Sequence, residues 1–338
     1  MNTQPLSPDF NFHKASQFIR SAAQKGAQLA VLPEYHLTNW VPTDPGFWDA
    51  CLLWKTYLDK YIALAEECRI CIVPGTIVEA LRDDDTGEEK LVNVSYFISH
   101  EGKVLGRYEK KNLWYSLLRC FSCLDATSTA VWIPLLMEYR HPERPHLASS
   151  TTAPHSVIET PIGPVGLLIC WDLAFPEAFR ELIAAGAKTI IIPTFWTLAD
   201  CSPYGLSANP RAEALFLEST LTARAFENTC CIIFVNAGGA AASSKKGSGT
   251  PEPEEGKSGP PPDLKLSTGH YAGLSRVALP FVGALGDETK DSAEEGMSIV
   301  DVNMQHVEEA EANYKVRADM DSETWHYSYR HQGREEKL

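Results

Sequence analysis

Cys170 occupies a position in the sequence at which a thiol can act as a nucleophile. It follows the apolar run 165–169, which is short and branched and therefore predicts a buried strand. Pro176 then suits the first turn of a helix that should end at Gly186. A thiol between a strand and a helix feels the positive end of the helix dipole, which favours the thiolate that attacks carbon. The alternative for an isolated cysteine is a small hydrophobic residue of the core.

Two further segments place ionisable side chains at the ends of predicted strands. Glu34 follows the apolar segment 27–33, and the pair Lys110 and Lys111 follows a strand-like segment that begins at residue 106. Carboxyl ends of strands are where α/β sheets collect functional groups. A carboxylate, an ammonium and a thiol therefore occupy three equivalent strand ends.

These three segments, in this order, resemble the nitrilase, or carbon-nitrogen hydrolase, superfamily, whose signature is a Glu-Lys-Cys triad. Matching segments at 223–228 and 235–239 extend the resemblance over most of the chain. The resemblance implies Glu34 as the general base, Lys110 as the cation that stabilises the oxyanion, and Cys170 as the nucleophile.

Lys110 is preferred to Lys111 for the lysine role. The family pattern places an aromatic residue two positions before the lysine and a leucine three positions after it, as Tyr108 and Leu113 are here. Lys111 is then solvated or ion-paired. The chemistry also makes the backbone N–H of Trp171 a second donor to the oxyanion.

The activity that the resemblance implies is thiol-dependent hydrolysis of non-peptide carbon-nitrogen bonds. Glu34 takes the thiol proton, Cys170 attacks a carbonyl carbon, and water hydrolyses the resulting thioester. This cycle requires neither a metal nor an organic cofactor. Trp171-Asp172 after the cysteine, in place of the Trp-Glu usual in true nitrilases, favours a small-molecule amide or N-carbamoyl substrate over a nitrile. Nitrile hydrolysis is one alternative, and a non-catalytic relative that persists as a binding or dimerising protein is another.

Glu143 is the accessory residue that the resemblance implies. Many members of the family carry a second glutamate shortly after the lysine, where it orients the substrate or the hydrolytic water. Here residues 115–140 separate the two, and they match nothing expected of the family. Without these 26 residues, Glu143 would follow Lys110 at 7 positions rather than 33.

Residues 115–140 are therefore treated as an unexpected insert, for which we advance the hypothesis of a retained intron in the gene. The alternative is a genuine surface loop, because the entropy of loop closure grows only slowly with length. The apolar character of the segment 131–137 argues against a loop, because a loop would expose an apolar patch beside the predicted site.

The resemblance implies an α/β fold, a four-layer α-β-β-α sandwich of the nitrilase type that pairs into homodimers or higher homo-oligomers. The chain 1–338 is expected to form a single carbon-nitrogen hydrolase domain. The stretch 240–268 is rich in Ser, Gly, Pro and charged residues, which cannot bury surface, so it is predicted to be a flexible loop of that domain. Phe195 and Trp196 follow the predicted strand 189–193 and either line the substrate pocket or fill the core.

Helices and supporting residues are predicted as follows. A first helix should begin near Asn11, which is a good N-cap residue. In the family a core strand precedes this helix, so residues 1–3 are expected to be the end of a truncated first strand. A later helix at 211–228 should bury Leu215 on its apolar face. Asn236 is expected to support the site through hydrogen bonds.

Composition and charge narrow the function classes. The net charge of −14 disfavours nucleic acid and anionic membrane surfaces as partners, and no apolar run approaches the ~20 residues that span a bilayer. Nine cysteines, an odd number, together with an apparent catalytic thiol favour a reducing compartment, so a cytoplasmic location is expected. The missing first strand leads us to expect an incomplete N-terminus as well. The pairs Cys68/Cys71 and Cys120/Cys123 are too far apart in sequence for a zinc ribbon, so no metal site is expected.

Overall fold

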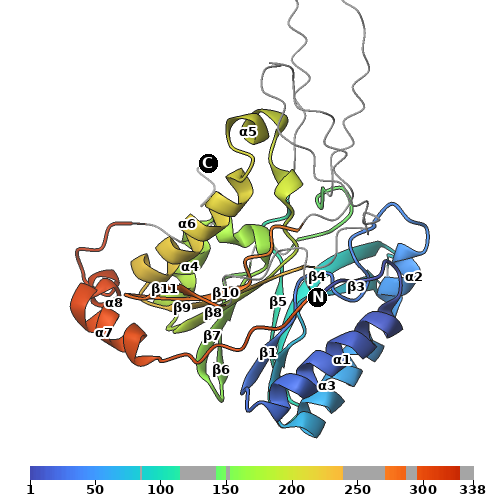
Figure 1. Ribbon diagram of the computed structural model, residues 1–338, viewed down its shortest axis with the longest axis horizontal. Coiled ribbons are helices and arrows are strands. Elements are labelled where there is room, and N and C mark those ends of the chain that lie inside the picture. Colours follow the sequence, from blue (N-terminus) through green and yellow to red (C-terminus); the bar gives the residue numbers. More distant parts are fainter. Residues whose placement is uncertain (84–85, 115–141, 150–152, 239–270, 287–294, 328–338) are drawn as a thin grey trace, which may run out of the picture.

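Two β-sheets lie face to face, with helices on the outer face of each (Figure 1). The computed structural model describes residues 1–83, 86–114, 142–149, 153–238, 271–286 and 295–327. The predicted α/β four-layer arrangement is confirmed for this part of the chain. The insert 115–140 and the low-complexity stretch 240–268 lie outside the described residues.

The first sheet has the strand order β1-β2-β4-β3, and β5 also pairs with β4. Its strands are β1 (Leu29–Val31), β2 (Cys71–Val73), β3 (Ile77–Arg82), β4 (Glu89–Ile98) and β5 (Val104–Glu109). Helices α1 (Pro8–Gln24) and α3 (Trp54–Cys68) cover its outer face (Figure 1). They bury Ile19 and Tyr61 against Ile72 and Val92 of the sheet, which completes one apolar layer.

The second sheet has the order β11-β10-β9-β8-β7-β6, and β7, β8 and β9 are parallel. Its strands are β6 (Val157–Thr160), β7 (Gly163–Leu167), β8 (Thr189–Thr194), β9 (Cys231–Asn236), β10 (Arg276–Leu279) and β11 (Gly283–Leu285). All six residues of β8 are buried, as expected for a parallel strand covered on both faces.

Helices α4 (Pro176–Ala184) and α6 (Ala212–Glu227) cover the outer face of the second sheet (Figure 1). The remaining helices are α2 (Phe47–Leu52), α5 (Pro203–Ala208), α7 (Gln305–Tyr314) and α8 (Val316–Met320). Among the described residues, no helix has both the length and the apolarity needed to span a bilayer.

The largest apolar cluster includes the space between the two sheets. It joins Phe97 and Tyr108 of the first sheet to Val165 and Ile191 of the second. The sheets approach so closely at β5 that a Cβ atom on Gly106 would lie 2.2 Å from Ile158 Cδ1. This close packing holds the strand that precedes Lys110 against the sheet that carries Cys170.

The predicted start of the first helix is wrong. Helix α1 begins at Pro8, and Asn11 lies inside it with its side chain fully buried. The Asn11 amide donates to the carbonyl oxygens of Gln4 and Leu37, both at 2.7 Å, so it links the helix to two loops. A polar residue that makes long-range hydrogen bonds can occupy a helix interior, and an N-cap pattern in sequence does not reveal such partners.

Helix α6 and residues 1–3 also differ from what the sequence predicts. Helix α6 is present, but Leu215 is 55% exposed, and Leu217 is the fully buried leucine. Residues 1–3 form no strand in the structure, although Met1 and Thr3 are buried. The strand expected at residues 1–3 is therefore not found, and the single-domain organisation remains a prediction.

The chain segments on either side of residues 115–141 meet directly. The backbone N–H of Glu143 donates to the carbonyl oxygen of Trp114 at 3.0 Å, and the Trp114 N–H donates to Glu143 Oε2 at 2.7 Å. If residues 115–140 were removed, Trp114 and Glu143 would be three positions apart. The first of these hydrogen bonds would then close a four-residue β-turn.

Deleting residues 115–140 is therefore expected to leave the fold intact and to raise the free energy of unfolding, by up to roughly 2 kcal/mol from the shorter loop closure. Urea unfolding of the two forms measures the difference. A shortened chain that unfolds at a lower urea concentration than the full chain would contradict the expectation and favour an integral loop.

Candidate active site

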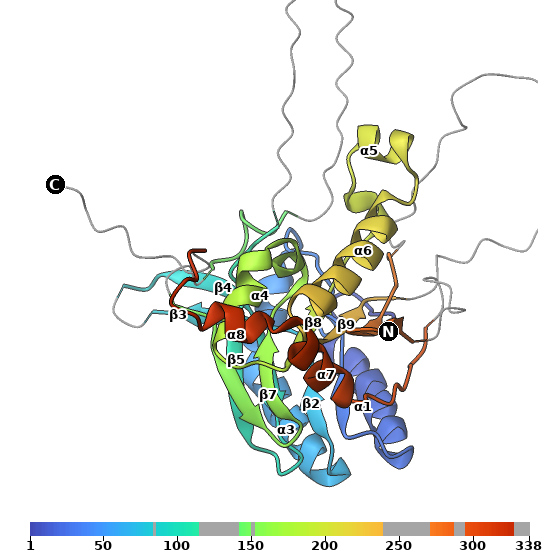
Figure 2. The same ribbon diagram turned by 90° about the vertical axis from the view of Figure 1, so that its left-hand side faces the viewer.

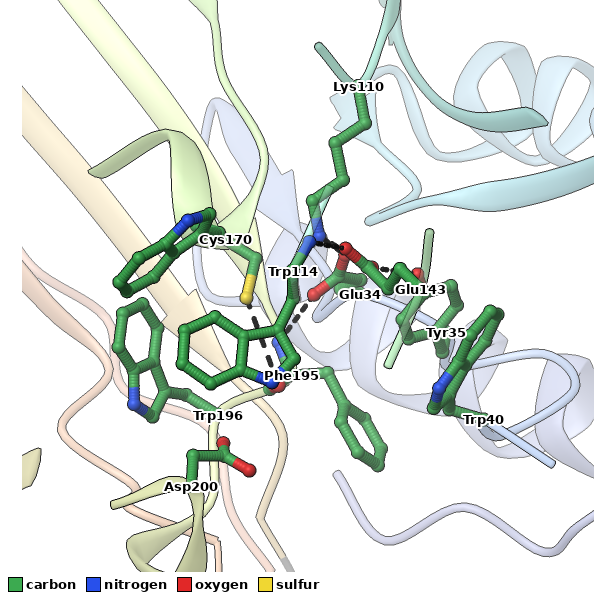
Figure 3. Close-up of a pocket in the computed structure, with 11 residues that line it drawn as sticks. Glu34, Tyr35, Trp40, Lys110, Trp114, Glu143, Cys170, Phe195, Trp196 and Asp200 are labelled. Atoms are coloured by element: carbon green, nitrogen blue, oxygen red, sulfur yellow. Dashed lines mark hydrogen bonds and ion pairs between the residues drawn. The ribbon is translucent and has the colours of Figure 1, made fainter. Parts of the chain in front are cut away.

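The three residues of the predicted triad line one pocket, which holds ≈ 390 Å³ of open space (Figure 3). Glu34 follows β1 at a short interval, Lys110 comes directly after β5, and Cys170 begins the 3₁₀ turn Cys170–Ala174 after β7. The first two come from one sheet and the third from the other. The two sheets therefore assemble the pocket between them.

Glu34 is held by the turn that joins β2 to β3. Gly75 in this turn has φ +60°, and a Cβ atom there would lie 1.9 Å from the carbonyl oxygen of Pro33. Only glycine allows both the left-handed conformation and this close approach. Thr76 Oγ1 accepts a hydrogen bond from the Tyr35 N–H at 3.1 Å. The turn therefore contacts the backbone on both sides of Glu34, at Pro33 and at Tyr35.

The Glu34 carboxylate is 1% exposed and bonded through both oxygens. Its Oε1 accepts from Asn93 Nδ2 at 2.8 Å and from Lys110 Nζ at 2.9 Å, and its Oε2 accepts from the Phe195 N–H at 2.8 Å. Burial raises the pKa of Glu34 to about 7, while the charge of Lys110 and a hydrogen bond from Cys170 lower it. A raised pKa of this kind suits a carboxylate that acts as a general base.

Lys110 extends its buried side chain between two carboxylates. Its Nζ lies 2.6 Å from Glu143 Oε1 as well as 2.9 Å from Glu34 Oε1. Burial acts to lower its pKa, but the charges of Glu143 and Glu34 outweigh that effect and raise it above the ordinary value, so the ammonium stays charged. Lys111 is only partly buried and does not line the pocket. Lys110 is thus the lysine that shares the pocket with the thiol.

Cys170 adopts φ +47°, a left-handed conformation that is uncommon for residues other than glycine. Its Sγ points into the pocket and lies 3.8 Å from the carbonyl oxygen of Phe195 (Figure 3). Strain of this kind gathers at functional sites, where surrounding structure maintains it.

The predicted effect of the helix dipole on Cys170 is outweighed in the structure. Burial and the charge of Glu34 raise the pKa of Cys170 well above its ordinary value, and Lys110 only partly offsets them. The residue opens a five-residue 3₁₀ turn rather than α4 itself, so the dipole of the longer helix begins six residues later. The thiol is therefore neutral at rest and needs a base, and Glu34 is placed to be that base.

Asp172 ties the cysteine turn to the lysine segment. Its fully buried carboxylate accepts hydrogen bonds from the Tyr108 hydroxyl at 2.7 Å, from the Asn112 side chain at 2.8 Å and from the Ile169 N–H at 2.9 Å. Tyr108 and Asn112 flank Lys110 in sequence. This carboxylate therefore fixes the position of Cys170 relative to Lys110, and it is not among the residues that line the pocket.

Glu143 accepts hydrogen bonds through both of its oxygens. Besides Lys110, Oε1 accepts from the Tyr35 hydroxyl, and Oε2 accepts from the Trp114 N–H. Tyr35 in turn stacks on Trp40, with ring centroids 4.6 Å apart. The structure places the predicted accessory glutamate in the pocket, where it holds Lys110 and Tyr35.

Phe195 and Trp196 both line the pocket, and both also pack against apolar clusters, so the two readings of the sequence hold together. Trp196 lies 5.5 Å from Trp171 between ring centroids, and Trp114 lies 4.4 Å from Trp171. The predicted support, Asn236, accepts from the Trp196 N–H at 2.8 Å and donates to its carbonyl oxygen at 3.1 Å. Asn236, the last residue of β9, thus fixes the backbone of Trp196 through two hydrogen bonds.

Several pocket residues escaped the sequence analysis. Tyr35, Trp40, Trp114 and Asp200 line the pocket, and Asn93 donates to Glu34 without being part of the lining. Tyr35 and Trp114 stand within a few positions of predicted catalytic residues, which is the only signal that sequence offers for them. Asn93 and Asp200 carry no such signal, because only the pairing of strands and the turn after β8 bring them to the pocket.

Within the described residues, no three His, Cys, Asp or Glu side chains lie close enough together to hold a metal ion. Cys68 and Cys71 are free thiols at the end of α3 and the start of β2. Cys120 and Cys123 lie outside the described residues.

Comparison with known proteins finds similarity to amidases and to a nitrilase. The chain is 29% identical over 229 residues to deaminated glutathione amidase of Bos taurus, which covers 66% of this chain and 58% of the bovine protein. It is also 29% identical over 213 residues to a nitrilase of Pyrococcus abyssi, which covers 62% of this chain and 66% of that protein. The chain thus spans less than two thirds of the length of these relatives.

Among solved structures, a carbon-nitrogen hydrolase of Helicobacter pylori superposes with a TM-score of 0.67 and 18% identity, over 93% of this chain and 90% of that one. This likeness shows a shared fold. The sequence model of the carbon-nitrogen hydrolase family matches residues 1–312. With nearly the whole length matched, the chain belongs to the carbon-nitrogen hydrolase family.

Proposed function

We propose that this protein hydrolyses a non-peptide carbon-nitrogen bond in a small-molecule amide or N-carbamoyl compound, through a thioester on Cys170. The observation that carries the proposal is the convergence of a thiol, a carboxylate of raised pKa and an ammonium in one pocket. Family membership and the amidase relatives support the same class of reaction.

Thioester formation follows from the resting state of the site. Glu34 takes the proton of the neutral Cys170 thiol as sulfur attacks the carbonyl carbon. The carbonyl oxygen becomes negative and is stabilised by Lys110 Nζ and the backbone N–H of Trp171, which lies in the first turn of a helix and so has no intrahelical acceptor. The C–N bond then breaks, and Glu34 returns the proton to the departing ammonia or amine.

Thioester hydrolysis reuses the same groups. Water enters as the amine leaves, Glu34 removes its proton, and hydroxide attacks the thioester carbon. The C–S bond breaks, the acid leaves, and the thiol regains its proton from Glu34. We assign Glu143 the role of positioning Lys110 and Tyr35, because its carboxylate accepts hydrogen bonds from these two side chains and from the Trp114 N–H.

Ammonia release tests the proposal. The full chain would be incubated with short carboxamides, N-carbamoyl amino acids and nitriles, and ammonia would be measured against an enzyme-free blank. Release from carboxamides or N-carbamoyl compounds supports the proposed class. Release from nitriles alone would favour the nitrilase alternative, since the chain is equally identical to a nitrilase. No release from any of them would favour a non-catalytic relative.

The rate should depend on pH through Glu34. Because only its carboxylate form can take the thiol proton, kcat/KM for a neutral amide is expected to fall about tenfold for each pH unit below about 7. A pH profile between 5 and 9 measures this limb. Asp200 also has a pKa raised to about 7 by burial, so the profile of Asp200→Asn serves as control and should keep the limb. A limb near pH 4.5 would contradict an assignment to Glu34.

Assembly and location remain proposals. We infer that the protein forms homodimers, and Tyr204 and Leu215, which are 83% and 55% exposed near the pocket end of α5 and α6, support an apolar contact there. The net charge supports small-molecule partners over nucleic acid and anionic membranes. The free thiols of the described cysteines support a reducing, cytoplasmic compartment.

A further inference from the structure

Asp200 is a pocket residue that the hydrolytic mechanism does not use. It ends the short turn Leu198–Asp200 after β8 and lines the same pocket as Cys170. Figure 3 shows its carboxylate at the far end of the pocket residues from Lys110, beside Trp196. Asp200 Oδ2 accepts from the Thr197 N–H at 2.8 Å, which closes the turn. An asparagine oxygen could make the same bond, so the turn alone does not explain a negative charge here.

A second carboxylate adds negative charge at this end of the pocket. Glu213 Oε2 accepts a hydrogen bond from the indole Nε1 of Trp196 at 2.6 Å. Burial raises the pKa of Asp200 to about 7, and the charges of Glu213 and Glu143 add to that shift. Among the ion pairs of the described residues, none includes Asp200 or Glu213.

Cations are scarce around the pocket. Within the described residues, Lys110 is the one basic side chain of the pocket lining, and Glu34 and Glu143 already engage it. A substrate carboxylate at the Asp200 end would therefore meet like charge and, in the part of the chain that the structure describes, no counter-ion in the pocket lining. A neutral alkyl group would leave a buried carboxylate without a partner, which costs free energy.

The aromatic side chains at the same end suit a cation. Figure 3 shows the indole rings of Trp114 and Trp196 near Cys170 and Asp200. The Trp171 ring lies 4.4 Å from the Trp114 ring and 5.5 Å from the Trp196 ring between centroids, so three indole rings gather at this end. Indole faces attract ammonium and guanidinium groups, and the attraction is stronger where water is excluded. A carboxylate and aromatic rings together are a recognised means of binding an organic cation.

We propose that the pocket selects amides that carry a cationic group, an ammonium or a guanidinium, with Asp200 as its charge partner and the tryptophans as its walls. The inference rests on the proposed amide hydrolysis, because it places the scissile carbonyl at Cys170. It assigns Asp200 as the residue that determines which acyl group the enzyme accepts.

Three amides of matched length test the proposal. They are 5-aminopentanamide, hexanamide and the monoamide of adipic acid, which end in an ammonium, a methyl and a carboxylate. The expected order of kcat/KM is cation, neutral, anion, with the cation ahead of the neutral amide by about 10- to 100-fold, the range for a hydrogen bond to a charged group. Homologues with two to five methylene groups would be tested in the same way to find the best length.

Asp200→Asn is expected to lower the ratio of kcat/KM for the ammonium amide over hexanamide by about 10- to 100-fold. Glu213→Gln keeps the acceptor for Trp196 and should lower the ratio less. Asp83→Asn is the matched control, because Asp83 closes a turn between β3 and β4 through the Thr86 N–H and does not line the pocket. A ratio near one in the wild type, or a ratio unchanged by Asp200→Asn, would overturn the inference.

Binding separates this inference from the proposed reaction. In Cys170→Ala, calorimetric titration with 5-aminopentanamide and hexanamide measures recognition without turnover. Tighter binding of the ammonium amide supports the inference even if no amide is hydrolysed, an outcome that would overturn only the proposed function. Equal binding of the two amides would overturn the inference even if both are hydrolysed.

Discussion

Cys170→Ala is expected to lower ammonia release from the best amide by at least ~10⁴-fold while the protein keeps its fold. Removing the nucleophile of a covalent mechanism eliminates the thioester route, and the remaining donors can accelerate only a slow direct attack by water. Alanine tolerates the backbone at φ +47° about as well as cysteine, and the change removes one sulfur atom from a buried position. The cost in unfolding free energy should therefore be about 1 kcal/mol.

The matched control is Cys68→Ala. Cys68 is a free, partly buried thiol at the end of α3 and does not line the pocket, so its loss should leave turnover within about twofold of the wild type. Rates and circular dichroism of both variants would be measured together. Turnover above 1% of the wild type in a correctly folded Cys170→Ala protein would contradict nucleophilic catalysis by Cys170.

Lys110→Met is expected to reduce both activity and stability. Loss of the ammonium that faces the oxyanion should lower kcat by ~10²–10³-fold. It also leaves the buried carboxylates of Glu34 and Glu143 facing each other without a cation, and breaking a buried ion pair from one side costs about 3–5 kcal/mol. Methionine fills a similar volume, so the effect comes from charge rather than from a cavity.

The stability loss in Lys110→Met should grow as the pH rises. Lys110 lowers the pKa of Glu34, so its removal raises that pKa further, and the folded variant binds protons more strongly than the wild type does. Folding of the variant is thus favoured at low pH, where the carboxylates are neutral, and weakened as they ionise. Urea unfolding at pH 6 and pH 8 measures this. Lys111→Met, the neighbouring control outside the pocket, should change neither quantity greatly, and an equal effect at Lys111 would contradict the assignment.

Sequence patterns predicted the elements that carry the site because each functional residue follows a short apolar run. Strand β7 and helix α4 flank Cys170 as expected, and Lys110 directly follows β5. Hydrophobic periodicity and a proline at the start of a helix are local signals, so they survive in the sequence. The boundaries differ by one to three residues, as at β7, which ends at Leu167 rather than at residue 169.

Long-range contacts decided where sequence reasoning failed. Asn11 has the type of an N-cap but forms hydrogen bonds to Gln4 and Leu37, which no local pattern discloses. The position of Cys170 before a helix favours the thiolate, yet burial and the nearby Glu34 charge dominate its pKa and raise it. A pKa depends on the dielectric and on charges from distant segments, and these exist only in the folded chain.

The sequence by itself determined the family and the triad candidates, because a thiol, a carboxylate and a lysine at three strand ends form an ordered pattern that the family shares. The tertiary structure alone decided how Glu143 comes beside Lys110 across 33 positions, and it alone brought Asp200 into the lining of the same pocket. The reason is that strand ends are local features, whereas the distances between them and their burial arise only when two sheets pack together.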